Sequence, residues 1–209
     1  MKRHIQIALI TLAALAPLAA QSVPQGWKQR IDRSASATDP DAAGTVKFVT
    51  QGAGFHSTNP QAATYWNPAN TASGAYTAKA TFNLVKPANH SCYYGLIFGG
   101  SNLDGPDQSY LYFQIDQYGT WLIKSRNGNA TPMLSAKTPN DAVKKPGADG
   151  TSTNTLEVRV GADKIDFVVN GVVVNSAPKA DAFAKTDGIY GLRVNHQLEV
   201  QIDGFGMSK

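Results

Sequence analysis

The stretch NTLEVRVGADKIDFVVNGVVVN, residues 154–175, decides the fold. Asn170-Gly171 lies between two β-branched runs, which is the strongest short-range signal for a two-residue type I′ hairpin turn. Such a turn pairs Val169 with Val172. The residues then expected on one apolar face, with Phe167 opposite Val174, are Ile165, Phe167, Val169, Val172 and Val174.

The run before this hairpin alternates in the same way. Its apolar side holds Leu156, Val158 and Val160, and its polar side holds Glu157 and Arg159. A four-residue loop, 161–164, sets Val160 opposite Ile165, whereas a three-residue loop would turn one strand's apolar residues over. The pattern predicts an antiparallel meander with one apolar face, which a second sheet must cover.

Strand patterns recur along the rest of the chain, and no long amphipathic helix interrupts them. The further stretches expected as strands are 45–50, 63–66, 75–84, 93–98, 110–116, 120–126, 188–194 and 198–202, with one helical turn within 180–187. Segment 127–153 is rich in Gly, Pro, Asn, Thr and Lys and is expected to be a long loop. About eleven or twelve strands, with no linker or internal repeat, predict one all-β domain built as a two-sheet antiparallel sandwich.

The first twenty residues do not share this pattern. Lys2 and Arg3 precede an apolar run, 5–18, and Ala19-Ala20 follow it, which is the layout of a secretory signal peptide cleaved before Gln21. The run is too short for a good membrane-spanning helix, and an uncleaved anchor is the alternative. We therefore expect a signal peptide at 1–20, a single domain at 21–209 with no membrane span, and export to the periplasm or the extracellular space.

The charge and the cysteine content limit which binding partners and which stabilising bonds the chain can have. The chain has 19 Lys and Arg against 15 Asp and Glu, and loss of Lys2 and Arg3 leaves 17 against 15, a net charge of +2. No basic stripe is interleaved with aromatic residues, so we expect no nucleic-acid partner. Cys92 is the single cysteine, which excludes an internal disulfide. Stability must then come from core burial, for which about 189 residues suffice.

Several strand phrases point to a family. They are YGLIFGG (94–100), SYLYFQID (109–116), NTLEVRV (154–160), DFVVNGVVV (166–174), YGLRVN (190–195) and LEVQIDGFG (198–206). From Trp27 to Met207 the chain resembles the concanavalin A-like lectin/glucanase superfamily, and within it the bacterial secreted domains similar to laminin-G modules and 3-keto-disaccharide hydrolase domains. The resemblance implies a jelly-roll sandwich with a sugar-binding groove on one sheet. These phrases describe strand pairing, so they bear on fold more than on activity.

An enzyme is the alternative, a sugar hydrolase or lyase similar to the 3-keto-disaccharide hydrolases. Glycoside hydrolysis usually needs two carboxylic groups, about 5–5.5 Å apart for retention and about 6.5–9.5 Å for inversion. Glu199 and Asp203 share a face of the last strand but lie about 13 Å apart, and the E-x-D-x-x-E motif of the superfamily's glucanases is absent. Catalysis therefore requires acids from separate strands to meet, and the first to test are Glu157, Glu199, Asp116 and Asp203.

Metal and nucleophile signals are sparse. His56, His90 and His196 show no ligand spacing, so we expect no zinc site and no metal cofactor. The loop 102–107 offers the oxygen ligands of Asp104 and Asp107 for calcium, although Asp-Gly-Pro-Asp is also ordinary turn chemistry. Cys92 near His90 is expected to be a small buried hydrophobe rather than part of a catalytic dyad.

The better candidates are polar-aromatic strand faces. Aromatic rings bind the C–H face of a sugar, and planar hydrogen-bonding groups bind its hydroxyls. Leu111, Phe113 and Ile115 are expected to face the core of their strand. The groove candidates are Tyr110, Tyr112, Gln114, Arg193, Asn195 and His196.

The sequence thus favours an exported, lectin-like β-sandwich that binds a glycan or polysaccharide. The enzyme is one alternative. A non-catalytic adhesion or structural module with a protein partner is another.

Overall fold

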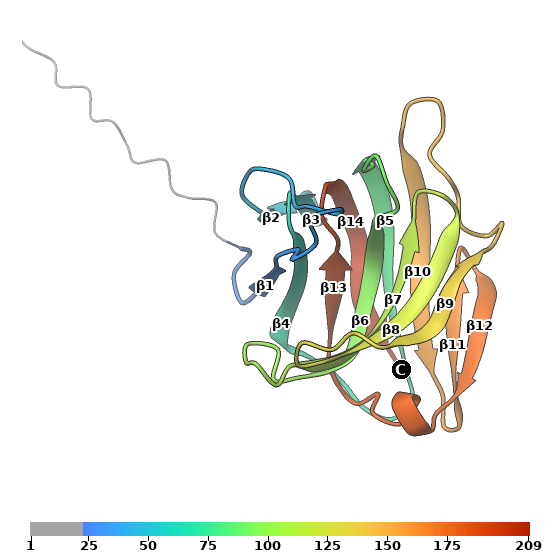
Figure 1. The fold of residues 1–209 in the computed structure, drawn as a ribbon. Coiled ribbons are helices and arrows are strands. Elements are labelled where there is room, and N and C mark those ends of the chain that lie inside the picture. The colour runs from blue at the N-terminus through green and yellow to red at the C-terminus, as the bar shows by residue number, and fades with distance from the viewer. Residues whose placement is uncertain (1–22) are drawn as a thin grey trace, which may run out of the picture.

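The computed structural model describes residues 23–209. The expected signal peptide, 1–20, lies outside the described residues. Within 23–209 the chain forms two seven-stranded antiparallel sheets that pack face to face (Figure 1). The only described helix is the single 3-10 turn Asp181–Phe183, the helical turn expected within 180–187, so no described helix is long and apolar enough to cross a bilayer.

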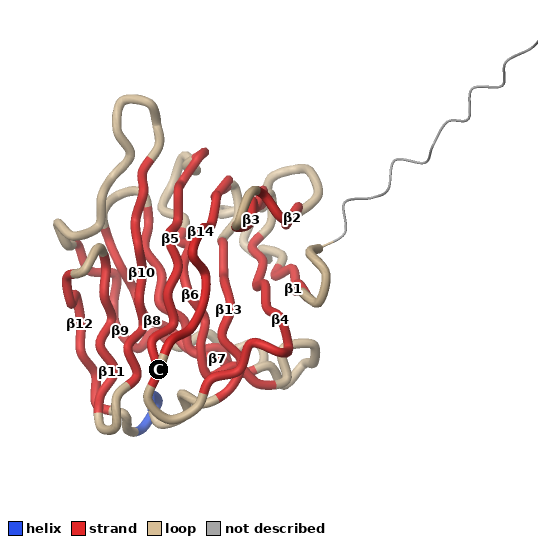
Figure 2. Tube along the Cα trace, turned by 180° about the vertical axis from the view of Figure 1, so that it is seen from behind, coloured by secondary structure: helices blue, strands red, loops and turns tan. Residues whose placement is uncertain are grey.

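Neighbouring strands in the first sheet are, in order, β1 (Lys28–Asp32), β4 (Ala62–Ala72), β13 (Gly188–Val194), β6 (Tyr93–Ser101), β7 (Ser109–Asp116), β8 (Thr120–Asn127) and β9 (Met133–Pro139). In the second sheet they are β12 (Val172–Pro178), β11 (Lys164–Val169), β10 (Ser152–Val160), β5 (Tyr76–Lys86), β14 (Leu198–Ser208), β3 (Gly54–Asn59) and β2 (Lys47–Gln51), as Figure 2 shows from behind. The fold is the predicted two-sheet jelly-roll sandwich.

The predicted meander forms β10, β11 and β12. Asn170 and Gly171 have φ values of 50° and 84°, as a type I′ turn requires. Val160 lies opposite Ile165, so the four-residue register is confirmed. The Asn170 side chain also closes the turn: its Oδ1 accepts the Thr155 N–H at 2.8 Å, and its Nδ2 donates to the Ala142 carbonyl at 2.7 Å.

One part of the predicted face is wrong. Phe167 lies opposite Asn175 rather than Val174, because a bulge shifts the register of β12 by one residue. Val172 pairs with Val169 as predicted but is 51% exposed, and Val174 is only half-buried. Because β12 is the edge strand, its apolar side chains extend past the main core.

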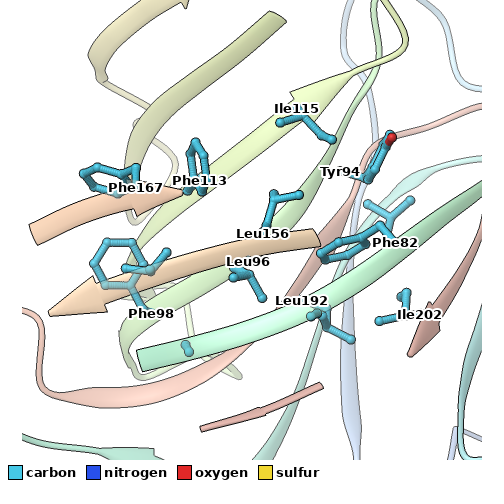
Figure 3. Packing of buried hydrophobic residues seen from close by; sticks show 14 of the residues in the cluster. Phe82, Tyr94, Leu96, Phe98, Phe113, Ile115, Leu156, Phe167, Leu192 and Ile202 are labelled. Carbon is cyan, nitrogen blue, oxygen red and sulfur yellow. The ribbon is translucent and has the colours of Figure 1, made fainter. Parts of the chain in front are cut away.

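The core lies between the sheets and uses the alternating residues of both. Phe113 of β7 packs on Phe167 of β11 with ring centroids 5.3 Å apart, and Leu156, Leu192 and nearby residues fill the layer around them (Figure 3). Leu111, Phe113 and Ile115 all face this core, as predicted. The opposite faces of the same strands are therefore free to build a site.

The structure also contains strands that the sequence did not predict. β1 and β3 lie in stretches without clear alternation, and β9 lies within the segment 127–153 that was expected to be a loop. β9 has a mostly exposed or half-buried pattern and pairs with β8 at the sheet edge. Backbone pairing alone defines it, which is why apolar periodicity did not find it.

Candidate functional site

The outer face of the first sheet carries a groove of about 460 Å³. Its walls come from β6, β7, β8, β9 and β13 and from the segments that flank them. The residues lining it are Ser91, Tyr93, Tyr112, Gln114, Leu122, Lys124, Thr131, Met133, Lys137, Arg193 and Asn195. Its volume falls within the usual range for small-molecule pockets, about 300–1,000 Å³.

Strand register brings these side chains together. Tyr112 lies directly opposite Lys124, and across β6 the residue Gly95 lies between Arg193 and Gln114. A Cβ on Gly95 would lie 2.2 Å from the Phe113 carbonyl oxygen, so only glycine fits there. Without a side chain between them, the Gln114 amide reaches across and donates to the Arg193 carbonyl at 3.3 Å. Backbone pairing thus fixes the positions of Tyr112, Gln114 and Arg193, which form the floor of the groove.

Arg193 is the most constrained charge of the floor. Its Nη1 donates to Asp32 Oδ2 at 2.5 Å, to Thr64 Oγ1 at 2.9 Å and to the Tyr110 hydroxyl at 3.1 Å. Its guanidinium carbon lies 5.5 Å from the centre of the Tyr112 ring, a cation–π distance. Burial alone would lower the pKa of Arg193, but Tyr110, Asp32 and Tyr112 together raise it above its ordinary value. Arg193 is therefore always charged and holds the floor in place.

Two lysines add positive charge to the groove. Lys137 donates to Ser91 Oγ at 2.8 Å, lies 3.4 Å from Asp116 Oδ2 and sits 5.8 Å from the Tyr93 ring centre. Lys124 has no carboxylate partner within residues 23–209. Burial, followed by repulsion from Arg193 and Arg126, lowers the pKa of Lys124. No acidic side chain lines the groove, whereas three cationic side chains do.

Asn195 supplies an unused hydrogen-bond acceptor. Its Oδ1 is buried and has no hydrogen-bond partner among the described residues. A buried acceptor without a partner is costly, and the residue that carries it lines the groove.

The six predicted groove residues separate into three groups. Tyr112, Gln114, Arg193 and Asn195 line the groove. Tyr110 lies beneath it, in a small apolar cluster with Trp66 and Ile97, and supports Arg193 through its hydroxyl. His196 does not line the groove and faces His90 and Asp41 instead.

Sequence reasoning missed Lys124 and Lys137. Lys124 could have been found from the sequence, since the hairpin turn 117–119 sets Tyr112 opposite Lys124 on one face. Lys137 lies on β9, the strand that periodicity did not reveal, so its approach to Ser91 and Asp116 required the tertiary structure.

The four acids proposed for catalysis do not meet. Asp116 belongs to the first sheet, where it accepts hydrogen bonds from Ser91 and from the Tyr118 and Thr120 amides of its own hairpin. The other three, Glu157, Glu199 and Asp203, lie on the outer face of the second sheet, across the sandwich from Asp116. Glu157 lies beside Lys79 and Asp203 beside Thr81 on opposite sides of β5, which puts their strands about 10 Å apart. The sandwich therefore separates Asp116 from the other three acids, and β5 separates Glu157 from Asp203.

Other sequence candidates have simpler roles. Asp104 pairs with Lys28 at 2.6 Å, and no group of three ligating side chains within residues 23–209 includes Asp104 or Asp107. Cys92 is buried in the main core, as expected. Burial, with smaller contributions from Asp39 and Asp116, raises the pKa of its thiol to about 12, so the free thiol is a poor nucleophile at neutral pH.

Comparisons with known proteins agree with this architecture. No protein-family model matches the chain, and no curated protein matches it. Among solved structures, the chain is similar to the carbohydrate-binding module CBM66 from Bacillus subtilis, with a TM-score of 0.62 and 13% identity over 88% of this chain and 96% of that one. The fold is that of the concanavalin A-like sandwiches.

Two further structures have comparable scores. A protein of unknown function with a galectin-like fold from Bacillus subtilis aligns with a TM-score of 0.58 and 13% identity, over 87% of this chain and 88% of that one. The carbohydrate recognition domain of Emp46p in a metal-free form aligns with a TM-score of 0.57 and 11% identity, over 87% of each chain. At these identities the likeness establishes the fold, and the site must be argued from its own residues.

Proposed function

We propose that this protein binds carbohydrate in the groove on the outer face of the first sheet and prefers glycans that carry negative charge. The observation that carries the proposal is the composition of the groove: tyrosine, amide and hydroxyl groups side by side with three cationic side chains and no acid. Two of the structures with this fold are described as a carbohydrate-binding module and a carbohydrate recognition domain, which supports the first half of the proposal.

Each group has a partner on a sugar acid. The Gln114 and Asn195 amides suit sugar hydroxyls, and the tyrosine rings suit C–H faces. Lys124 suits a carboxylate or sulfate, because an anion would offset the burial and the repulsion from Arg193 and Arg126 that together lower its pKa. Lys137 is already shared with Asp116, and Arg193 with Asp32, so Lys124 is the cation with most to gain from a ligand.

We further propose that the domain works outside the cytoplasm, as an exported module. The support is the signal-peptide pattern at 1–20. Polysaccharides with uronic acid or sulfate groups are extracellular polymers, which agrees with that location. The separation of the four candidate acids supports binding without hydrolysis.

The experiment compares polygalacturonate with its fully methyl-esterified form by isothermal titration calorimetry. The two polymers share a backbone and differ in charge. We expect saturable binding to polygalacturonate that weakens about tenfold on esterification, the loss of roughly one good charge contact. The Lys124→Met variant should lose about the same factor, and the control Lys79→Met, on the opposite face of the molecule, should bind as the unmodified protein does.

Equal affinity for the two polymers, or for both lysine variants, would contradict the anionic preference. Failure to bind any member of a wider panel of neutral and sulfated polysaccharides would overturn the carbohydrate-binding proposal itself.

A further inference from the structure

Four potential metal ligands converge at one end of the first sheet, beside the groove. His90 and Cys92 immediately precede β6, His196 follows β13, and Asp39 belongs to the segment between β1 and β2. The backbone holds the first two segments together, because the Asn195 N–H donates to the Tyr93 carbonyl at 2.8 Å. Residues far apart in the sequence thus meet at one point.

The ligating atoms are close to one another. His90 Nε2 lies 3.1 Å from His196 Nε2 and 3.1 Å from Cys92 Sγ. Asp39 Oδ1 lies 2.8 Å from His90 Nε2 and 3.1 Å from His196 Nε2. Ligands around a tetrahedral zinc ion, at bond lengths of about 2.0–2.3 Å, lie roughly 3.3–3.7 Å apart. The separations in this cluster, 2.8–3.1 Å, are a few tenths of an ångström shorter, so the ligands need to move only slightly apart to admit the ion.

The outer ring atoms of both histidines are already oriented. His196 Nδ1 lies 3.1 Å from Asp41 Oδ1, and His90 Nδ1 lies 2.8 Å from Asn89 Oδ1. In the tautomer with the ring proton on Nδ1, each Nε2 keeps a lone pair that can bind a metal. Carboxylate or amide contacts of this kind typically orient metal-binding histidines.

This arrangement points lone pairs at one another. Two unprotonated imidazole nitrogens and a carboxylate oxygen within about 3 Å repel each other, and either protons shared among them or a metal ion removes that repulsion. The remaining ligand, Cys92 Sγ, suits a zinc-type ion, whereas calcium and magnesium prefer oxygen ligands alone.

We propose that His90 Nε2, His196 Nε2, Cys92 Sγ and Asp39 Oδ1 bind one zinc ion. Four protein ligands make a closed site, which is the pattern of structural rather than catalytic zinc. The ion joins the 33–46 segment to the ends of β6 and β13, next to groove residues Ser91 and Asn195. Cys92 and His196 are buried while the Asp39 side chain is half exposed, so the ion enters from the Asp39 side.

The test uses the purified protein, stripped with EDTA and then titrated with zinc alone. We expect one zinc ion per chain by elemental analysis and a rise in Tm on zinc addition, because a ligand that binds only the folded state stabilises it. Cobalt in place of zinc should give intense visible bands of tetrahedral Co²⁺ and a near-ultraviolet thiolate-to-cobalt band. Copper is left out, since it binds most nitrogen and sulfur sites more tightly than zinc and would not discriminate.

Two variants and one control make the assignment specific. His90→Gln removes a partly exposed ligand and should fold, and it should bind zinc at least tenfold more weakly than the unmodified protein. Cys92→Ser should abolish the thiolate band, with circular dichroism as the check that it folds. The control is His56→Gln, since His56 pairs with Glu199 on the second sheet and should leave zinc binding unchanged.

Three outcomes overturn the proposal: no zinc retained after removal of excess metal, a Tm that zinc does not change, or a cobalt spectrum without the thiolate band. A cluster in which the four side chains share protons and bind no metal would give the first two of these outcomes. The glycan-binding experiment reports on Lys124 and ligand charge and does not require zinc, so either proposal can fail while the other stands.

Discussion

The two outer faces of the sandwich use similar residue types in opposite ways. On the second sheet the half-buried acids are paired with neighbours on the sheet, and the lysines without a partner within residues 23–209, Lys47 and Lys86, are exposed to solvent. Glu157 accepts from Arg159 Nη2 at 2.7 Å and from Lys79 Nζ at 3.2 Å, and Asp203 Oδ2 accepts from Asn83 at 2.9 Å. On the first sheet the corresponding layer is a groove in which Lys124 has no carboxylate partner and Asn195 Oδ1 has no donor among the described residues.

The difference shows where binding capacity lies. A face whose polar groups already satisfy one another gains little from a ligand, because each new contact replaces an existing one. A face with a half-buried, uncompensated lysine gains from an anion that contacts it. Polar and aromatic composition does not separate the two faces, and buried atoms without a hydrogen-bond partner occur on both, as His56 Nδ1 and Gln201 Oε1 show for the second sheet. The half-buried, unpaired Lys124 distinguishes the groove face.

The largest expected contrast concerns arginine. Arg193→Leu should lower the free energy of unfolding by about 2–4 kcal/mol, since breaking a buried ion pair costs about 3–5 kcal/mol and Arg30 and Arg126 remain near Asp32. Arg159→Leu on the second sheet should change it by at most about 1 kcal/mol, because its pair with Glu157 is exposed. Urea denaturation measures both. Equal losses would mean that the groove floor is no more constrained than the opposite face.

A smaller contrast concerns asparagine and glycan affinity. Asn195→Ala should weaken binding of an acidic polysaccharide about five- to tenfold, the effect of losing one hydrogen bond of about 1–1.5 kcal/mol. Asn83→Ala, which removes a donor to Asp203 on the second sheet, should leave that affinity unchanged. Calorimetric titration checks both variants. Loss of affinity in the Asn83 variant instead would place the site on the other face.

The smallest contrast is in stability and its dependence on pH. Lys124→Met should raise the free energy of unfolding by a few tenths of a kcal/mol, because burial and the nearby arginines disfavour its charged form. In the unmodified protein the folded-state pKa of Lys124 lies below its value of 10.5 in the unfolded chain. Its contribution to stability therefore increases as pH rises between these two values.

Glu157 has the opposite dependence. Burial raises its pKa, but hydrogen bonds and charge from Arg159 and Lys79 outweigh burial and lower it from 4.5. Its stabilising contribution is therefore present above about pH 4.5 and is lost as pH falls through the lower folded-state pKa. Denaturation measured across pH gives the free energy of unfolding as a function of pH. Lys124→Met should flatten the alkaline part of this curve, and Glu157→Gln should flatten the acid part. A variant that alters the wrong part would contradict the charge assignment.

The sequence by itself determined the architecture, because strand alternation and turn chemistry are local. Asn170-Gly171 adopts the positive φ values that its residue types permit, and the alternation around Phe113 separates the core face from the outer face. The same alternation identified Tyr112 and Gln114 as groove residues, but it did not single out Lys124, which the 117–119 hairpin sets opposite Tyr112.

Tertiary structure decided what depends on contacts between distant segments. The edge position of β12 and its bulge exposed Val172, and β9 formed by pairing with β8 rather than through an apolar pattern. His90 and His196 lie 106 positions apart in the chain, so no local spacing predicted that their Nε2 atoms would lie 3.1 Å from each other. Periodicity determines which way a side chain points, whereas the side chain that it meets depends on which strands become neighbours.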